Sequence, residues 1–199
     1  MGDVERHPHR QDQVLIAPVI PENLAESFQP VIGQAVTIRP LRPDDLPIEA
    51  EFLQGLSLET RSSRLLGGAI KISHAYLERL TNVDYPREMA FAASLMLENS
   101  ERMIGVARYV TAEDGRSCEF AIVIADDWQG KGIGSRMIEK LVVVARAAGL
   151  AEMHGDVLAQ NRPMLELMKK LGFRLSRHPE DGTLLRVTYA LAGSPPARG

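Results

Sequence analysis

The stretch DDWQGKGIGSRM, residues 126–137, places three glycines at alternate positions directly before a long helical pattern. Glycine weakens a helix, so its use at Gly130, Gly132 and Gly134 needs a reason. The first turn of a helix leaves backbone N–H groups unpaired and carries about half a positive charge from the aligned peptide dipoles. Because glycine has no side chain to keep an anion away from these groups, the stretch predicts a phosphate cradle on the amides of residues 130–134.

Two familiar nucleotide-binding patterns fit this stretch poorly. The loop that binds nucleoside triphosphates requires GxxxxGK[ST], which the stretch does not match. The dinucleotide pattern GxGxxG requires a glycine three residues after Gly132, where Ser135 stands, and no acidic residue ends a suitable following strand. Both alternatives are thereby weakened.

Apolar periodicity around the glycine stretch predicts an α/β chain. Strands are expected at residues 35–41, 89–97, 103–110, 118–124, 152–158 and 184–190, with another restarting at Gly172-Phe173. Helices are expected from Asp44 or Asp45 to Leu56, from Ser57, and at residues 73–82, 132–148 and 162–171. The apolar face expected for the helix at 132–148 consists of Met137, Leu141, Val144 and Ala148. This order of strands and helices predicts a mixed sheet with helices on both faces.

The two ends of the chain are expected to lie outside this domain. Prolines interrupt residues 1–35 and no sustained period appears there, which predicts a flexible extension with one short helix around residues 21–28. Residues 36–192 form the predicted domain, and residues 193–199 a disordered tail. The N-terminus lacks the basic start and apolar run of a secretory signal.

Composition narrows the class of protein. Charged residues make up 25% and hydrophobic residues 45% of the 199 residues, as in soluble globular proteins. The net charge of −3 argues against nonspecific binding to nucleic acid. No stretch reaches the ~18 apolar residues that a membrane-spanning helix needs. One cysteine and five scattered histidines give no zinc spacing and suit a reducing compartment. We therefore expect a cytoplasmic protein without a metal centre.

At this point the motifs resemble those of a known family. QGKGIG at residues 129–134 matches the Q/R-x-x-G-x-G/A motif of the GNAT superfamily, the acyl-CoA-dependent N-acetyltransferases. Asn161, followed by Leu171-Gly172-Phe173, resembles the family's second signature, an asparagine with LGF further along. The resemblance covers residues 36–190. It implies the GNAT fold: a mixed, mostly antiparallel sheet with helices on both faces and a splayed central parallel strand pair.

A narrower resemblance involves four segments. RPLRPDD at 39–45, LSLETRSSRL at 56–65, DYPREMAFAA at 84–93 and EFAIVIADDWQGKGIG at 119–134 resemble the acetyltransferase domain of bacterial protein lysine acetyltransferases. In that group the domain is often joined to a cyclic-nucleotide-binding or acyl-CoA-synthetase-like module. A chain of 199 residues is not expected to accommodate either module.

The resemblance implies acetyl-CoA as co-substrate. The residues expected to hold it are Val123, Ile124, Gln129, Gly130, Lys131, Gly132, Ile133, Gly134, Ser135 and Asn161. A backbone N–H of Val123 or Ile124 is expected to donate to the thioester oxygen as that oxygen gains charge. Asn161 either hydrogen-bonds the cofactor arm or caps its own helix.

Glu119 is the candidate general base. Strand alternation places Glu119, Ala121 and Val123 on one face of the sheet, where we expect apolar neighbours to strengthen its basicity. By resemblance, the corresponding glutamate takes the proton of the amine, directly or through water. The alternative is an ion pair with an arginine such as Arg108 or Arg116.

Two sulfur-containing residues stand near positions of chemical interest. Many members of the family carry a tyrosine shortly before LGF that protonates the leaving thiolate, and Met168 stands at that place. Met168 is expected to pack in the core, and the thiolate to take its proton from solvent or to leave unprotonated. Cys118 lies on the opposite strand face from Glu119 and is expected to be a buried apolar residue rather than an acyl-carrying nucleophile.

The sequence thus predicts an acetyl-CoA-dependent N-acetyltransferase that acts on a protein lysine by direct transfer in a ternary complex. A small-molecule amine acetyltransferase and a non-catalytic acyl-CoA-binding sensor remain the alternatives. The expected partner is a protein, which an acyl-CoA synthetase would fit, or a small amine, with no nucleic acid or membrane. The sequence leaves monomer and homodimer open.

Overall fold

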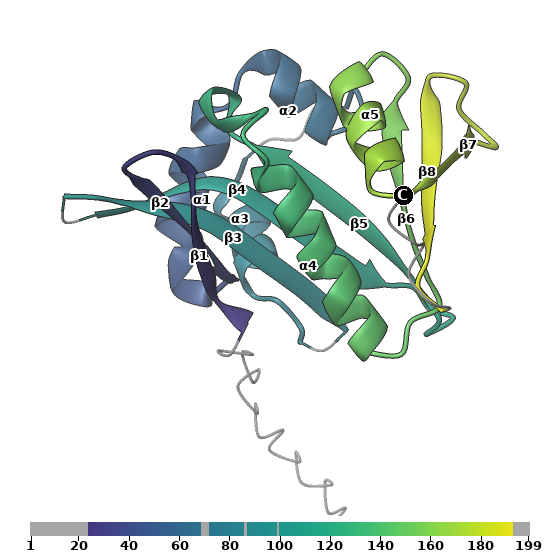
Figure 1. Ribbon diagram of the computed structural model, residues 1–199, viewed down its shortest axis with the longest axis horizontal. Helices are drawn as coiled ribbons and strands as arrows, with labels where there is room; N and C mark the ends of the chain where they lie inside the picture. The colour runs from purple at the N-terminus through teal and green to yellow at the C-terminus, as the bar shows by residue number, and fades with distance from the viewer. Residues whose placement is uncertain (1–23, 69–71, 86, 99, 193–199) are drawn as a thin grey trace, which may run out of the picture.

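The computed structural model describes residues 24–192 except 69–71, 86 and 99. An eight-stranded sheet in the order β1-β2-β3-β4-β5-β6-β8-β7 runs through this part of the chain (Figure 1). β5 (Ser117–Ile124) and β6 (Glu152–Leu158) pair in parallel, and the other neighbouring strands pair antiparallel. The predicted mixed, mostly antiparallel sheet is therefore confirmed.

The remaining elements follow the predicted order closely. The other strands are β1 (Glu26–Val31), β2 (Gln34–Pro40), β3 (Glu88–Leu97), β4 (Ser100–Thr111), β7 (Arg174–Arg177) and β8 (Leu184–Ala190). The α-helices are α1 (Leu46–Gly55), α2 (Leu58–Arg64), α3 (His74–Thr81), α4 (Ile133–Ala147) and α5 (Arg162–Lys170). Short 3₁₀ turns η2 (Pro43–Asp45) and η3 (Asp126–Trp128) precede α1 and the glycine stretch. Within the described ranges, no helix is long and apolar enough to cross a membrane.

The helix predicted around residues 21–28 is wrong for the residues that the structure describes. Glu26–Val31 forms the edge strand β1, which pairs antiparallel with β2. Contacts with α4 account for this strand: Glu26 forms an ion pair with Lys140, and the Arg136 guanidinium lies 4.3 Å from the centre of the Phe28 ring. Such tertiary contacts override local propensity. Residues 1–23 of the predicted extension and the tail at 193–199 lie outside the described residues.

Two hydrophobic cores lie on opposite faces of the sheet. On one face, Cys118 and Phe120 of β5 join the core under α4; on the other, Val123 joins the core under α1 and α3. The predicted alternation along β5 therefore holds. The apolar face predicted for α4 needs a correction, because Val144 is only partly buried and Ala148 is exposed. The buried residues of α4 are Ile133, Met137, Ile138, Leu141, Val142 and Ala145.

The parallel strands β5 and β6 separate along their length. They are in register at Ser117↔Glu152, Cys118↔Met153 and Glu119↔His154. Each strand nevertheless keeps its outer partner: β5 pairs with β4 as far as Ile124, and β6 pairs with β8 as far as Leu158. The two strands are thus held apart by their outer neighbours, as the predicted splayed pair requires.

A glycine and an aromatic ring lie at the point of separation. A Cβ on Gly155, the residue after the last paired one in β6, would lie 2.8 Å from a carbon of the Phe120 ring and 3.1 Å from the Phe120 carbonyl oxygen. The Phe120 ring also packs against Phe173, with ring centres 5.4 Å apart, and Phe173 packs against Tyr189. Glycine at this position lets the ring lie directly on the β6 backbone.

We expect Gly155→Ala to lower the free energy of unfolding by about 1–3 kcal/mol, because the added methyl group must displace the Phe120 ring or its carbonyl. Urea unfolding monitored by tryptophan fluorescence measures this. Gly55→Ala is the matched control, since no heavy atom lies within 4 Å of its added Cβ. Equal stabilities for the two variants would contradict the packing described here.

Candidate active site

The glycine stretch links the end of β5 to α4 and contains two glycines with positive φ. Gly130 has φ of 73° and Gly132 has φ of 81°, in the left-handed region that other residues rarely adopt. Gly132 is the N-cap residue of α4 and makes no side-chain cap hydrogen bond. The amides of the first turn of α4 therefore lack the usual side-chain acceptor and are suited to an anion.

Gly134 differs from the other two glycines. It lies within α4, and a Cβ built there would meet a Leu167 methyl carbon at 3.5 Å, an ordinary van der Waals distance. The fold itself therefore has room for alanine at this position. Alanine would also favour the helix by about 1 kcal/mol, and the family motif admits alanine here, so a methyl group at this position is compatible with both the fold and the motif.

The side chains of Gln129 and Lys131 make hydrogen bonds to protein groups and so fix the conformation of the loop. The Gln129 amide nitrogen donates to the Ile124 carbonyl at 3.1 Å and to the Thr60 hydroxyl at 3.2 Å. The Lys131 ammonium donates to the Asp127 carbonyl and lies 5.3 Å from the ring centre of the buried Trp128. Ile133 is 1% exposed, so it can offer a ligand only its backbone. Ser135 is half-buried in the first turn of α4.

The backbone of β5 alternates between its two neighbours. The Ala125 N–H donates to the Ile104 carbonyl, and Ser117 accepts from the Ala112 N–H. By this alternation the backbone groups of Val123 also point toward β4, whereas those of Ile124 point toward the β6 side. Of the two predicted donors, Ile124 is therefore the one whose N–H faces the opening between the strands.

Asn161 and Met168 both have structural roles in α5. The Asn161 side-chain oxygen accepts from the Met164 N–H at 3.2 Å, which is the helix cap proposed as one of its two roles. Met168 is fully buried in the core under α4. Met168, which stands where many family members carry a tyrosine, thus packs in the core, as predicted.

The surroundings of Glu119 differ from the prediction. Glu119 is exposed, and in place of apolar neighbours it lies in register with His154 of β6. The reason is that α1, α2 and α3 cover the back of the sheet on the β2–β5 side and leave the β6–β8 side uncovered (Figure 1). Glu119 stands at the boundary, at the last paired position before β5 and β6 separate.

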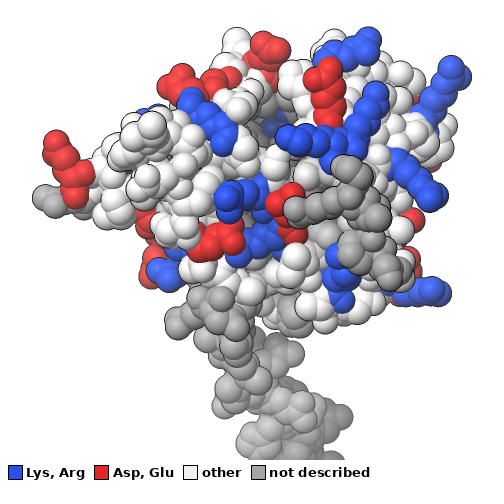
Figure 2. Space-filling view, in the orientation of Figure 1, with Lys and Arg blue, Asp and Glu red and all other residues white. Residues whose placement is uncertain are grey.

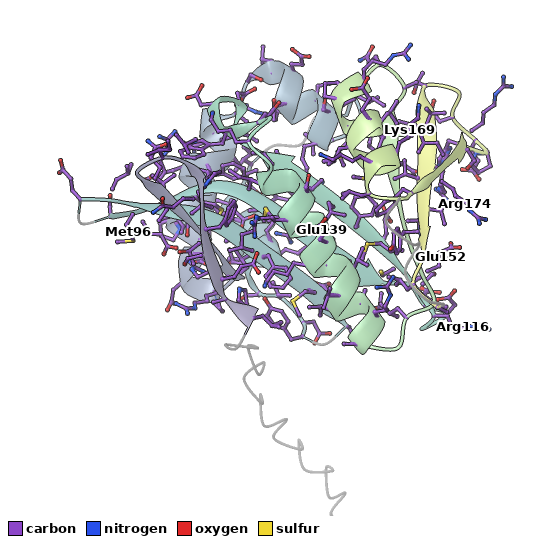
Figure 3. All side chains as sticks on the ribbon, viewed as in Figure 1. Met96, Arg116, Glu139, Glu152, Lys169 and Arg174 are labelled. Atoms are coloured by element: carbon purple, nitrogen blue, oxygen red, sulfur yellow. The ribbon has the colours of Figure 1, made fainter. Side chains whose placement is uncertain are left out.

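The predicted alternative of an ion pair with Arg108 or Arg116 is not formed. Arg108 instead lies 3.3 Å from the buried Glu49 carboxylate and donates to the Leu80 carbonyl. Arg116 lies beside Glu152 at the end of the sheet where β5 and β6 begin (Figure 3). Among the residues that the structure describes, no ion pair includes Glu119.

Sequence reasoning missed a polar cluster on the same uncovered face. The Arg186 guanidinium binds the Asp156 carboxylate through two hydrogen bonds of 2.8 and 2.9 Å, and His178 lies 3.4 Å from the same carboxylate. The hydrogen bonds from Arg186 lower the pKa of Asp156. The alternating polar residues at 154 and 156 could have indicated a polar face of β6. The sequence does not show which residues pair with Asp156, because these lie on β8 and in the turn before it.

Basic side chains gather near the end of the molecule that carries α5. The segment from 162 to 177 holds Arg162, Lys169, Lys170, Arg174 and Arg177 against one acidic residue, Glu166. All five basic residues are exposed. Figure 2 shows blue side chains over this part of the molecular surface, and Figure 3 places Lys169 and Arg174 there. This surface favours a polyanionic ligand.

Comparison with known proteins agrees with this geometry. A family model described as an acetyltransferase (GNAT) domain matches residues 35–174. The chain belongs to the GNAT acetyltransferase family. It is 39% identical over 160 residues to acetyltransferase PA5475 of Pseudomonas aeruginosa, covering 80% of this chain and 85% of that protein. The enzyme class predicted from the sequence is thereby confirmed.

Two further GNAT proteins are similar. Acetyltransferase Pat of Mycolicibacterium smegmatis is 31% identical over 142 residues, which is 70% of this chain and 41% of that protein. The chain thus spans less than half the length of this relative. The crystal structure of the GNAT domain of S. lividans PAT superposes with a TM-score of 0.75 at 23% identity, covering 86% of this chain and 99% of that one. This likeness confirms the predicted GNAT fold.

We expect Ser135→Asp to keep or raise stability, because a carboxylate is favourable in the first turn of a helix, while weakening CoA binding more than about tenfold, because the same charge repels an anion on the α4 amides. Isothermal titration calorimetry with CoA and thermal unfolding measure the two effects. Val143→Ala, on the exposed side of the same helix, should leave CoA affinity unchanged. Unchanged CoA affinity in Ser135→Asp would contradict the phosphate cradle.

Cys118 should be chemically inert in the folded protein. It is fully buried, and burial raises the pKa of its thiol to about 12, so it is protonated at neutral pH. We expect no reaction with Ellman's reagent until the protein is denatured, and Cys118→Ala should keep its turnover. Rapid labelling of the native thiol together with loss of turnover in Cys118→Ala would instead indicate an acyl-cysteine route.

Proposed function

We propose that this chain transfers an acetyl group from acetyl-CoA directly to the side-chain amine of a protein lysine. The observation that carries the proposal is the opening between β5 and β6, which lies between Glu119 and the first turn of α4. A co-substrate with its diphosphate on the α4 amides could extend its arm along this opening. The exposed basic residues of α5 and β7 favour the remaining negative charge.

In this arrangement the chain supplies a hydrogen-bond donor and a base. The Ile124 N–H would donate to the thioester oxygen as charge develops on it. Glu119 lies five residues earlier in β5, about 16 Å along an extended strand, so a chain of several water molecules would carry the amine proton to its carboxylate. The amine nitrogen then bonds to the carbonyl carbon, the carbon–sulfur bond breaks, and the thiolate takes a proton from solvent.

Several observations support a protein lysine over a small amine. Glu119 is exposed on an uncovered part of the sheet, which suits a substrate loop better than an enclosed small-molecule site. The nearby Asp156 carboxylate is already paired with Arg186, whereas a polyamine site would need free carboxylates. The resemblance of four segments of the sequence to bacterial protein lysine acetyltransferases points the same way.

The small-molecule alternative has one specific observation in its favour. An L-methionine sulfoximine/L-methionine sulfone acetyltransferase of Pseudomonas aeruginosa is 34% identical, though over 58 residues and 29% of this chain.

We expect the activity in the cytoplasm, where a lysine-bearing acyl-CoA synthetase would be an available protein substrate. Incubation with acetyl-CoA and a cell lysate, followed by mass spectrometry of modified lysines, separates the two substrate classes.

We expect Glu119→Gln to reduce turnover about 100-fold or more, because it removes the base but keeps the shape of the side chain. Its affinity for CoA should stay within about twofold, since the residue lies away from the α4 amides. Glu152→Gln, at an exposed glutamate of β6, is the matched control and should behave like the unaltered protein. Full turnover in Glu119→Gln would exclude this glutamate as the base.

A non-catalytic sensor gives a different result in the same experiments. If the unaltered protein binds CoA but acetylates neither proteins nor small amines, the transferase proposal fails and the sensor remains.

A further inference from the structure

The helix α2 is attached to the rest of the protein in an unusual way. The neighbouring helices bury apolar side chains, such as Phe52 and Leu53 of α1 and Leu77 and Leu80 of α3. α2 buries no residue, and its Leu58 is 82% exposed. Apolar burial is the usual means of fixing a helix on a sheet, so polar contacts must hold α2 in place.

Arg61 of α2 donates to the Gln54 and Leu56 carbonyls at the end of α1. The other polar contacts come from the segment that leads into the glycine stretch. One carboxylate oxygen of Asp126 accepts from the Ser57 N–H at 3.0 Å; the other accepts from the hydroxyls of Ser57 at 2.7 Å and Thr60 at 2.6 Å. The Ser57 hydroxyl in turn accepts from the Thr60 N–H, which caps α2. Gln129 adds its hydrogen bond to the Thr60 hydroxyl.

The Asp126 carboxylate is ionised in this network. Its pKa is lowered to about 2, first by the Ser57 N–H and then by the hydroxyls of Thr60 and Ser57. Hydrogen bonds to an ionised acceptor are stronger than neutral ones, and a negative charge is favourable at a helix N-terminus. The first turn of α2 is therefore fixed to the same short segment that presents the α4 amides.

We propose that Asp126 is a positioning residue that couples the cofactor loop to α2, so that CoA bound at the loop also orders the start of α2. The inference rests on the proposed function, because it takes the α4 amides as the binding site for CoA. A ligand there would immobilise residues 129–134, and Asp126 and Gln129 would carry this restraint to Ser57 and Thr60. The donors and acceptors between the two elements are the direct route for such coupling.

Hydrogen–deuterium exchange with CoA as the probe tests the coupling without knowledge of the acceptor. In the unaltered protein, CoA should slow exchange at least about fivefold both in the loop at 129–134 and in α2 at 60–65. In Asp126→Ala the loop should still be protected, while the effect of CoA on α2 should fall below about twofold. Thr60→Val removes the hydroxyl shared by Asp126 and Gln129 but keeps both hydrogen bonds from Ser57 to Asp126, so it should give a smaller loss in the same direction.

Asp181→Ala is the matched control. Its carboxylate accepts from the N–H and hydroxyl of Thr183 at 2.8 and 2.6 Å, in a turn far along the chain, so both protections should persist. The coupling is overturned if α2 stays protected in Asp126→Ala and Thr60→Val, or if CoA protects the loop but not α2 in the unaltered protein. A loop that does not respond to CoA at all would overturn the proposed binding site, and the coupling with it.

Discussion

The short parallel contact between β5 and β6 is the constraint on which the rest of the structure depends. Three residue pairs hold the two strands together, and after Glu119 they separate. Separation of strands inside a sheet would ordinarily leave both strands poorly supported, but here each keeps an antiparallel partner along its whole length. The opening is thus a stable feature of the sheet, and its unpaired backbone groups are available to a ligand.

Strand β5 joins every part of the candidate site. Its one face packs under α4 and its other face toward α1 and α3, so its position is fixed from both sides. The strand carries Glu119 at the closed end of the opening and Ile124 at the wide end, and it leads directly into the glycine stretch. Because these groups belong to one rigid strand, their spacing does not depend on the packing of separate domains.

Local patterns predicted those parts of the structure that local physics determines. The boundaries of β6 and β8 are as predicted, and the side chains of Ser57 and Asn161 cap their helices. Features that depend on distant partners could not be predicted. The strand β1 requires contacts with α4, and the Asp126 carboxylate binds a serine 69 residues earlier in the chain. The polar surroundings of Glu119 depend on which helices cover the sheet, which a single strand pattern does not show.

The three glycines at residues 130, 132 and 134 have different structural roles, which the motif match alone does not show. The sequence treats them alike, but Gly130 and Gly132 adopt left-handed backbone angles, so the fold alone accounts for them. Gly134 is an ordinary helical residue with room for a methyl group, so the fold does not account for it. The family motif admits alanine at this position, so Gly134 does not by itself point to a ligand. The evidence for an anion site lies instead in Gly130 and Gly132, because their backbone angles turn the chain so that α4 begins with amides that no side chain caps.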